Sequence, residues 1–388
     1  MSTALRANWS FPTRIWAGPG RIAELAEACA QLRIHRPLVV TDRGLVQHPM
    51  LQSALATLPR AALFGEVKGN PTAGNVADGL KAYRGGSHDG VVAFGGGSAL
   101  DTGKAVALMS GQTRPLWDFE DVDDWWMRAD SAGIAPVVAV PTTAGTGSEV
   151  GRAAVILNET THEKKILFHP QMMPTIVISD PELTVGLPRH ITAATGMDAF
   201  VHCFEAFCAR GFHPLADGVA LEGMRLIARF LPRACADGRD IEARANMLAA
   251  ASMGAAAFQK GLGAVHAIAH PVGSWFDTHH GLTNAVLLPY VMRHNRAAIA
   301  AKSELIARLL GLTNPSFEGL FDWVLELRQT LGIPHSLGEI GVDVGKASLI
   351  GEQAARDPSA AGNPMPVDAA TLERIFRAAV AGDLQAVG

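Results

Sequence analysis

The 388-residue sequence has little of what marks several classes of protein. Its four cysteines form no Cys-x-x-Cys pair, so neither a disulfide framework nor a cysteine-based zinc site is indicated. Charged residues make up 18%, the net charge is −4 and no basic run occurs, which argues against a general nucleic-acid binder. No apolar run is long enough to cross a bilayer, and the polar start MSTALRANWS lacks the apolar core of a signal peptide. We therefore expect a cytoplasmic protein without nucleic-acid or membrane partners.

The residues that are present predict two domains of different class. The chain is longer than one hydrophobic core usually grows, and 48% of it is hydrophobic. Short apolar runs at 37–41, 62–67, 90–94 and 136–140 alternate with helical periodicities, which predicts a parallel sheet with helices on both faces. From Pro188 onward, segments rich in Ala, Leu and Met predict helices and no further strand. We expect an α/β domain at 1–187 and an all-α domain at 188–388.

Two segments of the first domain are interpreted separately from this alternation. Residues 1–20 are mixed polar and aromatic, which suggests an edge hairpin that ends at Gly18-Pro19-Gly20. Residues 163–165 form a basic segment flanked by predicted strands at 153–157 and 175–179.

Two glycine-rich loops follow predicted strands. The first, GGGSALDTGK at 95–104, opens an apolar helix; its glycines let a ligand approach the backbone, and a helix N-terminus favours phosphate. It fits neither the Walker A pattern nor GxGxxG, and a plain strand-to-helix turn is the alternative. The second, PTTAGTGSE at 141–149, offers hydroxyl groups for a ribose or pyrophosphate. Ligands of open parallel sheets bind beyond the carboxyl ends of the strands, where both loops belong.

Asp42 stands at the end of the predicted strand at 37–41. A carboxylate there accepts a hydrogen bond from a ribose hydroxyl and repels a 2′-phosphate. The alternative is that Asp42 is the N-cap of the following helix.

Histidines are concentrated in residues 261–290 of the second domain. His266 and His270 are four apart, so both rings project from one face of a helix that Pro271 is expected to kink or end. His279 and His280 follow, and upstream the segment TGMDAFVHCFEA supplies Asp198 and His202, again four apart. One Asp with three His suits a first-row divalent metal. The alternative is a set of hydrogen-bonded core histidines.

These motifs together resemble the iron-containing (group III) alcohol dehydrogenase family. GGGSALDTGK, PTTAGTGSEV, DPELT, GMDAFVHCFEA and HAIAHPVGSWFDTHHGLTNAVLLP occur in the family's order, and the resemblance runs from about residue 8 to Asn363-Pro364. It implies an α/β dinucleotide-binding domain with a parallel sheet, an all-α metal-binding domain, and a dehydroquinate synthase-like architecture. The cofactors it implies are NAD and a divalent metal, with iron(II) expected and zinc(II) able to accept the same ligands.

The resemblance also implies roles for individual residues. The metal ligands are Asp198, His202, His266 and His280. His270 assists proton movement or lines the nicotinamide pocket. The cofactor-binding residues are Asp42, Asn70, Gly96, Gly97, Ser98, Asp101, Thr142, Thr143, Thr146 and Lys164, with Lys165 as an alternative to Lys164.

The expected reaction is hydride transfer between NAD(H) and a small primary alcohol or aldehyde. Phe258, Trp275 and Phe276 are large apolar side chains of the helical half that we expect near the metal ligands, lining the substrate pocket. Arg152 either binds an acidic group of the substrate or pairs with an acidic neighbour. The rival functions are a hydroxyacid–oxoacid transhydrogenase, a dehydroquinate-synthase-like lyase and a metal-storing protein. We expect a homodimer or larger homo-oligomer.

Overall fold

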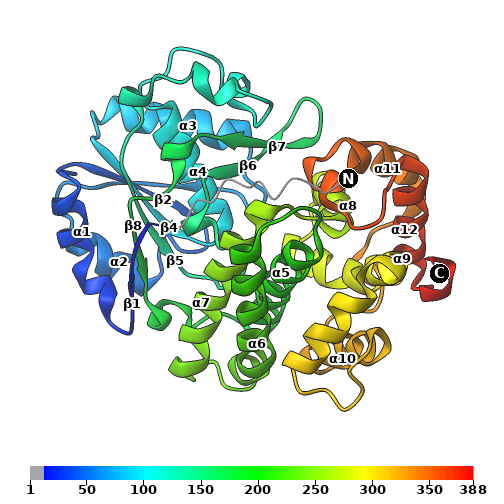
Figure 1. Ribbon diagram of the computed structural model, residues 1–388. Helices are drawn as coiled ribbons and strands as arrows, with labels where there is room; N and C mark the ends of the chain where they lie inside the picture. The colour runs from blue at the N-terminus through cyan, green and yellow to red at the C-terminus, as the bar shows by residue number, and fades with distance from the viewer. Residues whose placement is uncertain (1–12, 388) are drawn as a thin grey trace. The chain divides into compact units, whose positions relative to one another are not determined.

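The computed structural model describes residues 13–387, which divide into two compact units. One unit holds residues up to Thr143 together with Gly147–Gly186. The other runs from Leu187 onward and includes the short segment Ala144–Thr146. The first unit is α/β and the second is helical, as Figure 1 shows. The predicted fold class is thereby confirmed.

The α/β unit is built on a six-stranded sheet in the order β1-β8-β5-β4-β2-β3, with every neighbouring pair parallel. Its strands are β1 (Arg14–Ala17), β2 (Pro37–Asp42), β3 (Ala62–Val67), β4 (Gly90–Gly95), β5 (Val137–Pro141) and β8 (Ile176–Ser179). The central strands β4 and β5 are buried along their whole length. Their nearly continuous apolar sequences are expected of parallel strands that are covered on both faces.

The hairpin predicted for residues 1–20 is wrong where the structure describes it. Strand β1 pairs in parallel with β8, with Arg14 beside Ile176 and Ala17 beside Ser179. Parallel neighbours require a long crossover connection, so this pairing joins segments far apart in the chain. Residues 1–12 lie outside the described residues.

Helices cover both faces of this sheet (Figure 1). They are α1 (Leu25–Gln31), α2 (Pro49–Ala56), α3 (Ala73–Gly85) and α4 (Gly97–Met109). Alternate strand residues such as Val92 and Phe94 share a core cluster with Leu25 of α1 and Leu51 of α2. On α4, a Cβ added at Gly103 would lie 2.7 Å from the Cβ of Ala93, so glycine permits the close approach of this helix to β4.

A separate antiparallel pair joins β6 (Ala153–Asn158) to β7 (Glu163–Phe168). The basic segment at 163–165 is therefore part of a strand and does not merely separate two strands. Lys165 lies opposite Ile156, and its ammonium group is 2.9 Å from both carboxylate oxygens of Glu120. This ion pair explains how a charged side chain is accommodated on the strand.

The helical unit surrounds one long buried helix. Its helices are α5 (Arg189–Cys208), α6 (Pro214–Ala236), α7 (Ile241–Ala257), α8 (Ala264–Phe276), α9 (His280–Leu309), α10 (Phe317–Leu331), α11 (Ala347–Arg356) and α12 (Ala369–Ala381). Helix α5 packs against α6, α7 and α9 and is buried from Thr192 to Cys208, as its apolar sequence requires. Helix α8 does not end at Pro271 but continues to Phe276. Within the described part of this unit no strand occurs, as predicted.

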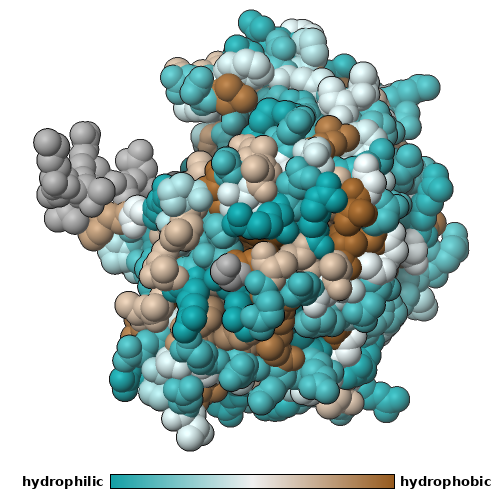
Figure 2. Space-filling view, turned by 90° about the vertical axis from the view of Figure 1, so that its right-hand side faces the viewer, coloured by the Kyte–Doolittle hydropathy of each residue, from teal (hydrophilic) through white to brown (hydrophobic). Residues whose placement is uncertain are grey.

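The surface seen in Figure 2 is mainly hydrophilic, and its hydrophobic residues lie in small separate patches. The large hydrophobic side chains that are exposed, such as Met127 and Leu305, are few and belong to different units. Across residues 13–387, we find no helix with the length and apolar character needed to span a membrane.

Candidate metal centre and cofactor loops

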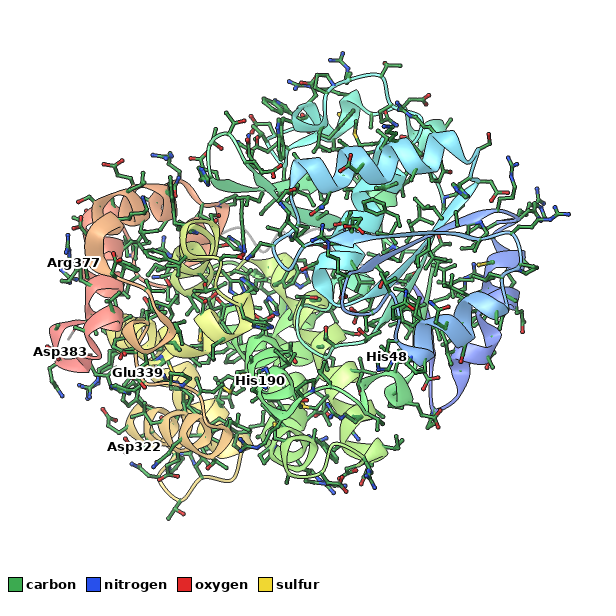
Figure 3. The ribbon with its side chains drawn as sticks, turned by 180° about the vertical axis from the view of Figure 1, so that it is seen from behind. His48, His190, Asp322, Glu339, Arg377 and Asp383 are labelled. Carbon is green, nitrogen blue, oxygen red and sulfur yellow. The ribbon has the colours of Figure 1, made fainter. Side chains whose placement is uncertain are left out.

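Helix α5 carries three polar side chains on one face of its buried length. Asp198, His202 and Glu205 occupy positions i, i+4 and i+7, so they project to the same side. Their exposed fractions are 1%, 4% and 5%. By contrast, His190 near the start of the same helix is exposed (Figure 3). Burying a carboxylate this completely is costly unless it is paired or coordinated.

Helices α8 and α9 bring two further histidines to this face of α5. One atom each of Asp198, His202, His266 and His280 lies within 4.8 Å of the others. His279 has a different role, because its Nδ1 accepts a hydrogen bond from the backbone N–H of Leu282 and caps α9. The structure thus brings together the four residues expected as ligands.

Glu205 fixes the orientation of His266. One carboxylate oxygen lies 2.7 Å from Nδ1 of His266, and the other accepts the backbone N–H of Val265 at 2.8 Å. Burial disfavours the imidazolium form, but the hydrogen bond and charge of Glu205 outweigh burial and raise the pKa of His266. With Nδ1–H donated to Glu205, the Nε2 of His266 is the ring atom that faces the cluster as an acceptor.

The other two rings near the cluster differ in their partners. Burial lowers the pKa of His202 to about 4, against the opposing charge of Asp198, so His202 is neutral at neutral pH. His270 stacks on His280 with 5.5 Å between ring centroids, and its Nδ1 lies 2.7 Å from Oδ2 of Asp357. Burial raises the pKa of Asp357, but the charge and hydrogen bond of His270 outweigh burial and lower it. His270 is therefore held by an ionised carboxylate beside the cluster.

The donor set fits a divalent cation of the first transition row. It combines one carboxylate with imidazoles, the ligand types that iron(II) and zinc(II) share. Hydrogen bonds from neighbouring residues orient the proposed ligands, as is usual at protein metal sites. Glu205 binds His266, and the amide nitrogen of Asn284 lies 2.7 Å from Oδ1 of Asp198.

Sequence reasoning missed Glu205, Asn284 and Asp357. Two of them carried a usable signal, because Glu205 lies seven residues after Asp198 and Asn284 four residues after His280, each on the ligand face of its helix. Asp357 carried none, since 87 residues separate it from His270.

The first glycine loop ends β4 and begins α4 in the α/β unit. Gly95 has a φ of +145°, and a Cβ there would lie 2.8 Å from the Cβ of Ala99, so the turn requires glycine. Gly96 is the N-cap, and no side chain in the described residues caps the helix at this position. The backbone N–H groups of Gly97 and Ser98 open a 13-residue helix, an arrangement that favours a phosphate.

Asp42 and the threonines after β5 lie close to this loop. A Cβ on Gly95 would be 3.3 Å from Oδ2 of Asp42, and one on Gly96 would be 3.4 Å from the Oγ1 of Thr143. The backbone N–H of Thr142 donates to the carbonyl of Gly95. Oδ1 of Asp42 accepts the N–H of Gly44, a turn contact that leaves Oδ2 facing the loop.

Other residues expected at the cofactor are engaged within the protein. The hydroxyl of Ser98 donates to the carbonyl of Gly69, which precedes the half-buried Asn70. Asp101 accepts from Ser148 and from the backbone N–H of Val155, and lies 3.1 Å from the buried ammonium of Lys104. These contacts give Asp101 an anchoring role between α4, the second loop and β6.

Two of the residues expected at the cofactor belong to other segments than the first loop. Thr146 is grouped with the helical unit, and Lys164 lies on β7 opposite Leu157.

The residues expected at the substrate differ in which part of the protein they contact. The ring of Phe258 lies 5.2 Å from that of His202, beside the cluster. The indole N–H of Trp275 donates to Gln353 of α11 at 2.8 Å, and Phe276 packs on the core of the helical unit. Arg152 lies in the α/β unit with its guanidinium over the ring of Phe168, 5.4 Å from the centroid.

Asp121 is an acidic residue near Arg152. Burial raises the pKa of Asp121, and Arg152 opposes that rise. Both predicted roles of Arg152 stay predictions.

Comparison with known proteins places the sequence and the fold in one group. Residues 12–181 match the family described as "Iron-containing alcohol dehydrogenase" and residues 192–380 match its C-terminal domain. The chain is 37% identical over 376 residues to 4-hydroxybutyrate dehydrogenase of Cupriavidus necator, covering 94% of this chain and 98% of that protein. A crystal structure of 1,3-propanediol oxidoreductase superposes with a TM-score of 0.90 at 35% identity, covering 96% and 100% of the two chains. Sulfoacetaldehyde reductase from Bifidobacterium kashiwanohense, solved with NAD+, gives a TM-score of 0.86 at 26% identity, covering 96% and 98%.

Proposed function

We propose that this chain, which belongs to the iron-containing alcohol dehydrogenase family, interconverts a small primary alcohol and its aldehyde with NAD(H) as the hydride carrier. Family membership makes the chain a metal-dependent alcohol oxidoreductase. The roles of individual residues, the preference for NAD, the identity of the metal and the substrate are the proposal. The observation that carries the proposal is that four potential ligand atoms lie within 4.8 Å of one another inside the helical unit.

Asp198, His202, His266 and His280 are proposed to hold the cation. One carboxylate and three neutral imidazoles leave a divalent ion with a formal charge of +1, so it stays electrophilic. When bound, the cation would polarise the alcohol oxygen as a Lewis acid, and the nicotinamide would exchange the hydride. The half-buried ring of Phe258 lies beside His202, where it would shield one side of the cluster from water.

His270 is proposed to hold a proton for the reaction at its Nε2 atom. Its Nδ1 is 2.7 Å from Asp357, whose lowered pKa keeps that carboxylate ionised. The pairing fixes the tautomer and leaves Nε2 as the nitrogen that takes up or releases a proton. The Asp357 side chain is buried, with 7% of it exposed, and contacts His270 directly. Asp357 therefore positions the imidazole ring.

The first glycine loop is proposed to bind the pyrophosphate of NAD. The N–H groups of Gly97 and Ser98 at the start of α4 would receive it, and Asp42 would accept a hydrogen bond from the adenosine ribose. A 2′-phosphate would meet Asp42 as a like charge, which disfavours NADP.

The substrate is proposed to be a short primary alcohol or aldehyde with an acidic group at its far end. Two similar proteins carry names that refer to 4-hydroxybutyrate and to sulfoacetaldehyde, both of which bear an acid group. Arg152 is the side chain proposed to bind this acid group. The rival interpretation is a structural role, in which Arg152 packs on Phe168 and pairs with Asp121. Iron(II) is the proposed metal, and the homo-oligomer and cytoplasmic location stay predictions.

The test is absorbance at 340 nm with NAD and a panel of neutral and ω-carboxylated alcohols, repeated after chelation and after reconstitution with iron(II) or zinc(II). NADH formation that disappears on chelation and returns with one metal supports the proposal. Turnover that survives complete metal removal contradicts the metal assignment. Hydride exchange between two substrates without net reduction of free NAD would indicate the transhydrogenase instead.

A further inference from the structure

Asn284 is buried at the centre of the histidine and aspartate cluster and has no assigned role. It lies on α9 one helical turn after His280, so both side chains project from the same face of the helix. Its side chain is fully removed from solvent. Its amide nitrogen lies 2.7 Å from Oδ1 of Asp198, 3.2 Å from Nε2 of His266 and 3.1 Å from Nε2 of His280.

The orientation of this amide is determined by the cluster. On its other side, the amide oxygen of Asn284 is buried and has no hydrogen-bond partner among residues 13–387. An unsatisfied buried acceptor costs about 1–3 kcal/mol. Turning the amide over would instead place its oxygen against the carboxylate oxygen of Asp198, where two acceptors repel. The amide therefore presents its donors to the ligand atoms despite the unsatisfied oxygen.

The number of donors limits what Asn284 can do. An amide nitrogen carries two hydrogens and faces three acceptors, one oxygen and two ring nitrogens. The shortest contact is to Asp198, and a carboxylate oxygen that accepts this bond leaves the second oxygen of the same carboxylate for a cation. Because the amide is neutral, it adds no charge to the set.

We propose that Asn284 is a positioning residue of the metal centre. Its N–H holds Oδ1 of Asp198, so the carboxylate presents its other oxygen in a fixed direction. The amide also lies against the rings of His266 and His280, whose Nε2 lone pairs are left for the cation. This inference rests on the proposed function, because it takes Asp198, His266 and His280 as ligands. Removal of such supporting contacts typically lowers metal affinity about 10- to 100-fold.

The experiment measures metal affinity directly, without activity. Asn284→Leu replaces the amide with an apolar side chain of similar size, and Asn284→Ala removes it. The matched control is Asn295→Ala, which removes another buried amide from the same helix. The hydrogen bonds found for Asn295 within residues 13–387 go to Asn363 and Met365 and not to the cluster. Each purified protein is stripped of metal, checked for its folded state by circular dichroism and melting temperature, and titrated with zinc(II) against a chromophoric chelator.

Both Asn284 variants are expected to bind zinc(II) about 10- to 100-fold more weakly than the unchanged protein, with similar deficits for Leu and Ala. Asn295→Ala is expected to lower the melting temperature and to keep its affinity within about twofold. A folded Asn284→Leu protein with unchanged affinity would overturn the inference, as would an equal loss in Asn295→Ala. The proposed ligand set fails separately if Asp198→Ala keeps the affinity of the unchanged protein.

Discussion

Replacing Glu205 with glutamine should weaken metal binding while leaving the helical unit folded. In the structure the Glu205 carboxylate accepts two hydrogen bonds, from Nδ1 of His266 at 2.7 Å and from the N–H of Val265 at 2.8 Å. A glutamine amide has one acceptor and one donor end, so it can serve only one of these two groups. If its oxygen keeps Val265, its NH2 meets Nδ1 of His266 and favours the tautomer that carries the proton on Nε2. That tautomer cannot bind a cation through Nε2.

The size of the effect follows from the lost contact. A hydrogen bond to a charged group is worth about 1.5–3 kcal/mol, which corresponds to a roughly 10- to 150-fold weaker binding constant. The effect should depend on pH. Glu205 raises the pKa of His266, so below that raised pKa a proton competes with the cation for the ring. Glutamine removes this rise, so proton competition begins at lower pH and the deficit should shrink as the pH falls from 8 to 6.

The assay is titration of the metal-free variant with zinc(II) at pH 6, 7 and 8. The matched control is Glu222→Gln on α6, which removes a partly exposed carboxylate paired with Arg225 at 2.7 Å and should leave affinity unchanged. Equal affinity of the Glu205→Gln and unchanged proteins at pH 8 would refute the reasoning. A deficit that grows toward pH 6 would contradict the assigned proton competition.

Three further predictions concern the cofactor, the substrate and the cysteines. Asp42→Gly should narrow the preference for NAD over NADP by removing a like-charge contact worth several kcal/mol as an order of magnitude; equal kcat/KM for both cofactors in the unchanged protein would contradict this. Arg152→Ala should lower kcat/KM for a carboxylated aldehyde but not for the matched neutral aldehyde, with a loss of about 1.5–3 kcal/mol of transition-state stabilisation. An equal fall in kcat/KM for both aldehydes would make Arg152 structural. Burial raises the thiol pKa to about 11 for Cys235 and to about 12 for Cys29, Cys203 and Cys208. Ellman's reagent at pH 8 should therefore label none of these thiols before the protein unfolds, and rapid labelling of the native protein would refute this.

The sequence by itself determined which side chains share a helix face. The spacing of Asp198 and His202, and the position of His266 on a second helix, follow from the 3.6-residue period, because the period is a local property of the backbone. The same local reasoning located the glycine loop at Gly95–Gly97, where a strand gives way to a helix. The parallel sheet was predictable too, since alternation of strands and helices leaves few other arrangements.

The tertiary structure decided which faces meet. It paired β1 with β8 where the sequence suggested a hairpin, and it placed Asp357 against His270 across 87 residues. It also assigned His279 to capping α9 and His280 to the cluster, although the two are adjacent in the chain. Such contacts depend on how whole helices and strands pack around the core, and a local pattern of residues does not contain that information.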